Sequence, residues 1–132
     1  MVRDRILIDT SIWIAYFKAS NPAIVELVEN IMTVAEICVP RVVLAELTQG
    51  ARTEQEVFAI GEFVGAFTIL DQKDETWDKT GKLSFQMKRK GISISLVDCY
   101  IAVIANENQC KLLTLDKHFK EIKRFIKIEL FE

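Results

Sequence analysis

The sequence predicts an α/β protein of three layers, in which a parallel sheet of four to five short strands lies between two layers of helices. Short aliphatic runs alternate along the chain with longer segments of helical periodicity, which is the pattern of strands joined by helical crossovers. Only two prolines and five glycines interrupt the 132 residues, so helices should dominate. The length suits one domain, and we expect residues 1–132 to form it, because no linker or internal repeat divides them.

Five short apolar runs are predicted to be strands. The first, RILID at residues 5–9, has no polar alternation, which is typical of a strand buried on both faces. The other predicted strands are residues 36–39 closed by Pro40, 67–70, 111–115 ending at Asp116, and 125–130. In a parallel sheet, ligands bind beyond the carboxyl ends of the strands, so the residues that follow each strand are the place to look for chemistry.

Helix signals fill the intervals between these runs. Thr10 and Ser11 can begin a helix that runs to about Lys18, and Asn21 and Pro22 are a cap and first position for the next. The remaining predicted helices are one that ends near Gly50, 54–66, 73–90 before Gly91, 95–106, and a short turn after Asp116.

Composition restricts the class of protein. The hydrophobic half and charged quarter of the chain are those of an ordinary globular protein, and the formal net charge is −2. This charge argues against a protein coated with positive charge, although it allows a local basic patch. Because residues 3–5 are charged, we expect no N-terminal signal peptide, and no apolar run approaches the roughly 20 residues that span a bilayer. We therefore expect a soluble, cytoplasmic protein.

The number and spacing of the cysteines also favour a cytoplasmic location. The chain has three, at positions 38, 99 and 110, none of them in a CxxC pair and each beside aliphatic residues. An odd number of such cysteines predicts buried free thiols in a reducing cytosol.

Four carboxylates stand where the predicted fold would bring them together. Asp9 and Asp116 end predicted strands, Asp98 lies in the first turn of a predicted helix, and Glu46 lies in the middle of an apolar helix. Strand ends and the helix starts that follow them share one edge of a parallel sheet. Crowded carboxylates are costly unless some are protonated or a cation neutralises them. Oxygen ligands favour Mg²⁺ or Mn²⁺.

Each carboxylate also has a simpler structural explanation. Asp116 could be only a helix N-cap, and Asp9 could cap or start the first helix. Asp98 stands three residues after Ser95, the position of a capping-box partner, and Glu46 could face solvent. Taken together, however, their positions beside aliphatic runs favour a shared site.

Four ordered motifs resemble those of PIN domains. They are ILIDTS at residues 6–11, AEL at 45–47, DCYIA at 98–102 and LTLDKHF at 113–119. No single motif is specific, but the ordered set covers almost the whole chain with the spacing of the family, and none of its acidic residues is missing. The small size and the lack of extra domains resemble the VapC branch, the toxins of VapBC toxin–antitoxin pairs.

The resemblance implies a metal-dependent endoribonuclease that hydrolyses RNA with water and leaves 5′-phosphate and 3′-hydroxyl ends. The residues that it implies as catalytic ligands of one or two Mg²⁺ or Mn²⁺ ions are Asp9, Glu46, Asp98 and Asp116. Hydroxyls beside these ligands or on the substrate side would come from Thr10, Ser11 and Thr114. Metal-free RNA cleavage usually needs a paired acid and base, often two histidines, and this chain has only His118, which we expect on the surface of the short helix.

Basic residues supply candidate contacts to RNA. One set is Lys82, Lys88, Arg89 and Lys90, and a separate set is Lys117, Lys120, Lys123 and Arg124. Such clusters make non-specific phosphate contacts. The alternative for residues 88–90 is that cations at the end of a helix complement its dipole.

A partner surface is also predicted. The helix at residues 12–17 is apolar nearly all round, so it is either buried or covered by a partner. The family resemblance implies a homodimer and a VapB-like antitoxin, a segment of which lies in a groove near the acidic pocket. The candidate contacts are Trp13, Ile14 and Phe17.

Other functions are less well supported. An aspartyl-phosphate phosphatase needs a second aspartate two residues after the first, where this chain has Ser11. A nucleotide-binding domain would have a glycine-rich loop after the first strand, and none is present. A non-catalytic PIN-like interaction module remains the alternative, although such a module would be expected to have lost acidic residues that are all present here.

Overall fold

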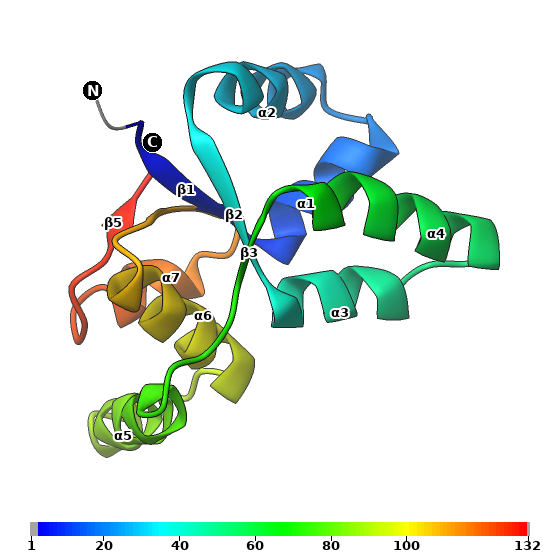
Figure 1. Cartoon of the computed structure of the whole chain (residues 1–132). Coiled ribbons are helices and arrows are strands. Elements are labelled where there is room, and N and C mark those ends of the chain that lie inside the picture. Colours follow the sequence, from blue (N-terminus) through cyan, green and yellow to red (C-terminus); the bar gives the residue numbers. More distant parts are fainter. Residues whose placement is uncertain (1–2, 132) are drawn as a thin grey trace.

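A five-stranded, wholly parallel sheet forms the centre of the computed structural model, which describes residues 3–131 (Figure 1). Its strands are β1 (Arg5–Ile8), β2 (Glu36–Pro40), β3 (Thr68–Leu70), β4 (Lys111–Leu113) and β5 (Glu129–Leu130). They lie in the order β3-β2-β1-β4-β5. The predicted α/β class and parallel sheet are confirmed.

Helices cover both faces of this sheet. The first group is α1 (Thr10–Lys18), α2 (Pro22–Val34), α3 (Arg41–Gln49) and α4 (Glu54–Phe63), the last followed by a 3₁₀ turn, η1 (Val64–Ala66). The second group is α5 (Thr76–Arg89), α6 (Leu96–Glu107) and α7 (His118–Ile122). Right-handed crossovers place the groups on opposite faces, since the chain first moves outward from β1 to β3 and later in the other direction to β5. Figure 1 shows α5–α7 together on one side and α1, α3 and α4 on the other. Within residues 3–131, no helix is both long and apolar enough to cross a bilayer.

The core lies on both faces of the central strands. Leu7, Ile8 and Leu112 are completely buried, which explains why these strands read as continuous apolar runs. Helix α6 is buried along almost its whole length. The three cysteines are buried free thiols, as the sequence predicted.

The strand order fixes where a functional site can form. β1 and β4 are neighbours, but the chain leaves β1 toward one face and β4 toward the other. Such a switch point opens a crevice beyond the carboxyl ends of the two strands. The N–H of Asp9 donates to the carbonyl of Leu113 at 3.0 Å, so the residues that follow β1 and β4 lie side by side.

Several predicted boundaries change. The strand expected at 125–130 is only Glu129–Leu130, because the N–H groups of Phe125 and Ile126 bond to the carbonyl of Ile122 at the end of α7. The helix expected at 73–90 begins later, where the Thr76 hydroxyl accepts a hydrogen bond from the N–H of Lys73 at 2.7 Å. The helix expected at 54–66 is an α-helix only to Phe63.

Candidate functional site

Asp9 is buried at the switch point, between the end of β1 and the start of α1. Its Oδ1 accepts a hydrogen bond from the N–H of Thr10 at 2.8 Å, so it caps α1. Its Oδ2 accepts from the hydroxyls of Thr114 at 2.7 Å and Ser11 at 3.1 Å. The residue is 5% exposed. Three donors therefore hold a buried carboxylate in one orientation.

The same two hydroxyls connect the loops after β1 and β4. The Ser11 hydroxyl accepts from the N–H of Leu115 at 3.0 Å, and the Thr114 hydroxyl accepts from the N–H of Asp116 at 2.9 Å. These backbone groups are bound by side chains instead of by a neighbouring strand. This explains why β4 ends at Leu113, whereas the sequence predicted a strand that continues to residue 115.

Glu46 reaches the start of α1 from the middle of α3. Its Oε1 accepts a hydrogen bond from the Thr10 hydroxyl at 2.7 Å, while the N–H of Thr10 binds Asp9. Thr10 therefore links the two carboxylates directly. Glu46 is partly buried, so it is not simply the solvent-facing residue of its helix.

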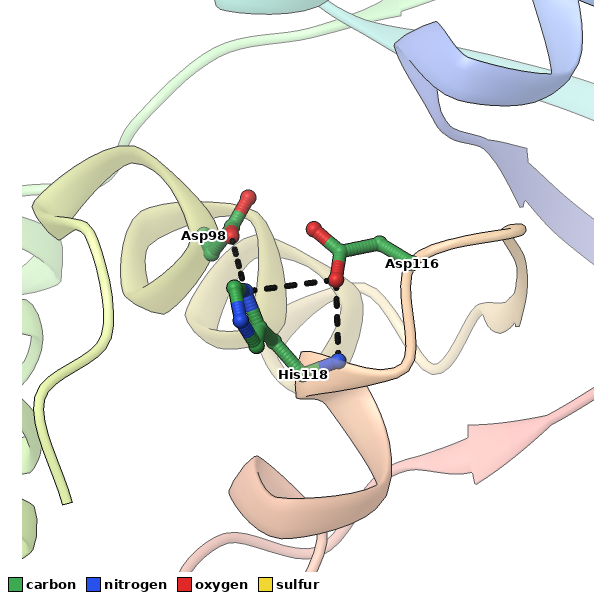
Figure 2. Close-up of side chains that lie close together, drawn as sticks. All are labelled: Asp98, Asp116 and His118. Carbon is green, nitrogen blue, oxygen red and sulfur yellow. Dashed lines mark hydrogen bonds and ion pairs between the residues drawn. The ribbon is translucent and has the colours of Figure 1, made fainter.

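Asp98 and Asp116 meet beyond the end of β4, at the start of α6. Asp98 lies in the first turn of α6, where its N–H donates to the cap hydroxyl of Ser95 at 3.1 Å. Figure 2 shows its carboxylate and that of Asp116 facing the ring of His118. Nδ1 of His118 lies 3.6 Å from Oδ2 of Asp98 and 3.2 Å from Oδ1 of Asp116. In the part of the chain that is described, these three side chains each offer a ligand atom, and the three atoms lie within 4.8 Å of one another.

Crowding changes the acidity of Asp98. Burial, the charges of Asp116 and Asp9, and a hydrogen bond with Asp116 together raise the pKa of its carboxyl group to about 6. The Ser95 hydroxyl opposes this rise. Protein without a cation therefore holds a proton on Asp98 below about pH 6. A cation placed among these groups would relieve the same repulsion.

The four carboxylates thus lie along one edge of the sheet in two linked pairs. Asp9 and Glu46 are joined through Thr10, and Asp98 faces Asp116. Thr114 connects the pairs, since its hydroxyl donates to Asp9 and accepts from the N–H of Asp116.

His118 is the residue whose place the sequence did not reveal. Its side chain is 59% exposed, as expected of the surface of a short helix, yet Nδ1 faces two carboxylates. The available signal was its spacing: an aspartate side chain often accepts the N–H two residues later, and Asp116 Oδ1 accepts from the N–H of His118 at 2.9 Å.

The model of the PIN domain family matches residues 6–125. This chain belongs to the PIN-domain family. Its fold is similar to that of a chain of VapBC2 from Rickettsia felis bound to a promoter DNA fragment, with 24% identity, a TM-score of 0.79, and coverage of 96% of this chain and 97% of that one. It is also similar to a chain of VapBC-1 from Haemophilus influenzae, with 23% identity, a TM-score of 0.78 and 97% coverage of both chains. A third similar fold is the Mycobacterium tuberculosis toxin VapC20, which cleaves the sarcin–ricin loop, with 14% identity, a TM-score of 0.67, and coverage of 94% and 98%. No curated protein sequence matches this chain significantly.

Both predicted basic sets lie on the surface of this PIN domain. Lys82 and the three basic residues at 88–90 are exposed on and just after α5, which packs against α6. Burial and the Asp98 charge raise the pKa of the Cys99 thiol, and the Lys88 charge opposes that rise. Lys88 therefore lies near Cys99, which follows Asp98 in the chain. The second set, on and beside α7, is also exposed, and its Arg124 is paired with Glu121 at 3.0 Å.

A groove beside Glu46 separates α1, α3 and α4 of the PIN domain. It has a volume of about 610 Å³, and its lining includes Ile14, Phe17, Leu47 and Ile60. Ile14 and Phe17 are 42% and 43% exposed.

The expectation that Trp13 contacts a partner has to be corrected. Trp13 is 0% exposed, because it packs within a cluster of aromatic rings that closes the space between α1 and the segment after α4. Those rings are Tyr16, Phe17, Phe63 and Phe67. Of the three predicted contacts, only Ile14 and Phe17 reach the surface.

Proposed function

We propose that this PIN domain is an endoribonuclease that requires a divalent cation and acts as a VapC-type toxin. The observation that carries the proposal is the convergence of Asp9, Glu46, Asp98 and Asp116 at the switch point of the sheet. The similar folds in VapBC complexes and in an RNA-cleaving toxin support the assignment to this branch.

The chemistry of the site fits a divalent cation. Its oxygen donors are those that Mg²⁺ and Mn²⁺ prefer. The carboxylates of Asp98 and Asp116 are close enough for repulsion to raise the pKa of Asp98, which a bound cation would relieve. We assign one or two Mg²⁺ or Mn²⁺ ions to this set, with Asp98 and Asp116 as one pair of ligands and Asp9 and Glu46 as the other.

The protein contributes orientation and charge to the reaction. When bound to these carboxylates, a divalent cation would lower the pKa of water toward neutrality and would neutralise the charge that develops on the phosphate. The hydrogen bonds from Thr10, Ser11 and Thr114 hold Asp9 and Glu46 in fixed orientations, so little reorganisation is needed during the reaction. Water is the nucleophile, and the products carry 5′-phosphate and 3′-hydroxyl ends.

Cleavage of a 5′-labelled RNA by the purified chain tests this function. We expect cuts with Mg²⁺ or Mn²⁺ and none with EDTA, and mapped products with 3′-hydroxyl ends. Cleavage that persists in EDTA and leaves cyclic phosphate ends would overturn the proposal. An Asp9→Asn sample prepared in parallel controls for contaminating ribonuclease.

We assign RNA binding to the basic end of α5. Replacing residues 88–90 with alanine should weaken binding. The negative slope of log K against log salt concentration should become shallower by about 2, since each phosphate contact to a single strand contributes roughly −0.7. Filter binding over a range of salt concentrations, with both variants on an Asp9→Asn background, measures this. Alanine at Lys120, Lys123 and Arg124 is the matched control. An unchanged slope for the α5 variant would refute the assignment.

The proposed partner is a VapB-like antitoxin. A segment of it would lie in the groove between α1, α3 and α4, with apolar contacts to Ile14 and Phe17 and access to Glu46. We also propose a homodimer and a cytoplasmic location, where the buried thiols stay reduced and RNA is accessible.

A further inference from the structure

We propose that His118 binds the divalent cation directly through Nδ1 and biases the site toward Mn²⁺ over Mg²⁺. The inference rests on the proposed function, because it concerns the cation assigned to Asp98 and Asp116. His118 is the single histidine of the chain, and its Nδ1 faces both carboxylates (Figure 2).

The distances from His118 Nδ1 to the two carboxylates are close to those between neighbouring ligand positions around one ion. Ligand atoms about 2.1 Å from a metal, at angles between square and tetrahedral, lie roughly 3.0–3.5 Å from each other. Nδ1 of His118 lies 3.2 Å from Oδ1 of Asp116 and 3.6 Å from Oδ2 of Asp98. A small ion between them would require little rearrangement.

The backbone of His118 is held beside the acidic site although its side chain is exposed. The N–H of His118 donates to Asp116 Oδ1 at 2.9 Å, and the N–H of Asp116 donates to the Thr114 hydroxyl. The next residue, Phe119, is completely buried and anchors α7 in the core. The start of α7 is therefore tied both to the acidic site and to the core, which positions the imidazole before any cation binds.

The type of ligand decides the preference. Mg²⁺ favours oxygen and keeps several waters. Mn²⁺ also takes oxygen ligands, but as a first-row transition metal it accepts an imidazole nitrogen more readily than Mg²⁺ does. A set made only of carboxylates would discriminate weakly between the two. The competing explanation is that His118 only forms an ion pair with Asp98 and Asp116, in which case a cation would displace the ring and Nδ1 would not bind it.

Electron spin echo spectroscopy of bound Mn²⁺ separates these explanations. Tag-free protein with Mn²⁺ should show modulation from a directly bound ¹⁴N, which can be assigned without any variant because the chain has one histidine. His118→Ala should lose this signal. Bound Mn²⁺ without ¹⁴N modulation in the unmodified protein would overturn the inference while leaving the metal site itself intact.

Titration with Mn²⁺ and with Mg²⁺ provides the second readout. His118→Ala should lose on the order of tenfold in Mn²⁺ affinity and much less in Mg²⁺ affinity. Lys117→Ala, an exposed neighbour, should change neither. Equal effects of His118→Ala on both ions, or no effect, would refute the preference. If the unmodified protein binds neither ion, the proposed function fails too. If Asp98→Asn loses binding while His118→Ala binds both ions normally, only the role of His118 is contradicted.

Discussion

Asp9→Asn is expected to reduce RNA cleavage on the order of a thousandfold, about 4 kcal/mol of barrier, while the fold remains intact. Asp9 is the most buried of the four carboxylates and lies at the junction of β1, α1 and β4. The substitution removes one negative charge from the set proposed to hold the cation. The loss should appear both in the rate of RNA cleavage and in the toxicity of the expressed chain.

The structure indicates why this variant should fold. Asparagine is as good an N-cap as aspartate, so its side-chain oxygen can still accept the N–H of Thr10. The hydroxyls of Ser11 and Thr114 can rotate to accept hydrogen bonds from the new amide group. Circular dichroism melting, beside single-turnover cleavage, separates a chemical effect from unfolding.

The matched control lies just before the same strand, at its opposite end. Asp4 is exposed and pairs with Lys111 at 3.0 Å, remote from the crevice. Asp4→Asn should therefore retain full activity. Full activity of Asp9→Asn would instead show that cleavage is not catalysed by this site, whereas no cleavage by the unmodified chain with either cation would support the alternative of a non-catalytic interaction module.

The parts of the site that the sequence predicted are those that depend on strand ends. Asp9 and Asp116 follow aliphatic runs, and any parallel sheet places such residues at one edge. The position of Asp98 in the first turn of α6 could be predicted from Ser95, whose hydroxyl caps this helix. The contact of Glu46 with Thr10 depends on the packing of α3 against α1, so the sequence could only suggest it.

The rest depended on contacts between distant segments. Helix α1 is apolar nearly all round, so periodicity did not indicate which side faces the core, and Trp13, a candidate partner contact, lies on the buried side. The orientation of His118 requires both α6 and the loop after β4 to be in place. The run at residues 125–130 has the composition of a strand, but the N–H groups of Phe125 and Ile126 bond to the carbonyl of Ile122 and are not available to a neighbouring strand.

Glu107→Ala is expected to destabilise the protein by about 3 kcal/mol and to lower its melting temperature by roughly 10 °C. The Glu107 carboxylate, at the end of α6, is buried and binds two residues of α5. It accepts from the Thr76 hydroxyl at 2.6 Å and from Lys79 Nζ at 3.1 Å. Removal leaves the buried Thr76 hydroxyl without its acceptor and Lys79 without its pair, and it opens a cavity between the two helices. Urea unfolding followed by circular dichroism measures the change.

Two variants isolate the contribution of charge to this contact. Glu107→Gln can keep the bond from Thr76 but loses the ion pair, so its loss of stability should lie clearly below that of alanine. Glu62→Ala, on the exposed side of α4, should change stability by less than about 0.5 kcal/mol. Because Glu107 lies at the opposite end of α6 from Asp98, cleavage by folded Glu107→Ala well below its melting temperature should be nearly normal. A large loss of activity in the folded variant would show that the α5–α6 contact controls the geometry of Asp98, and would contradict a purely stabilising role for Glu107.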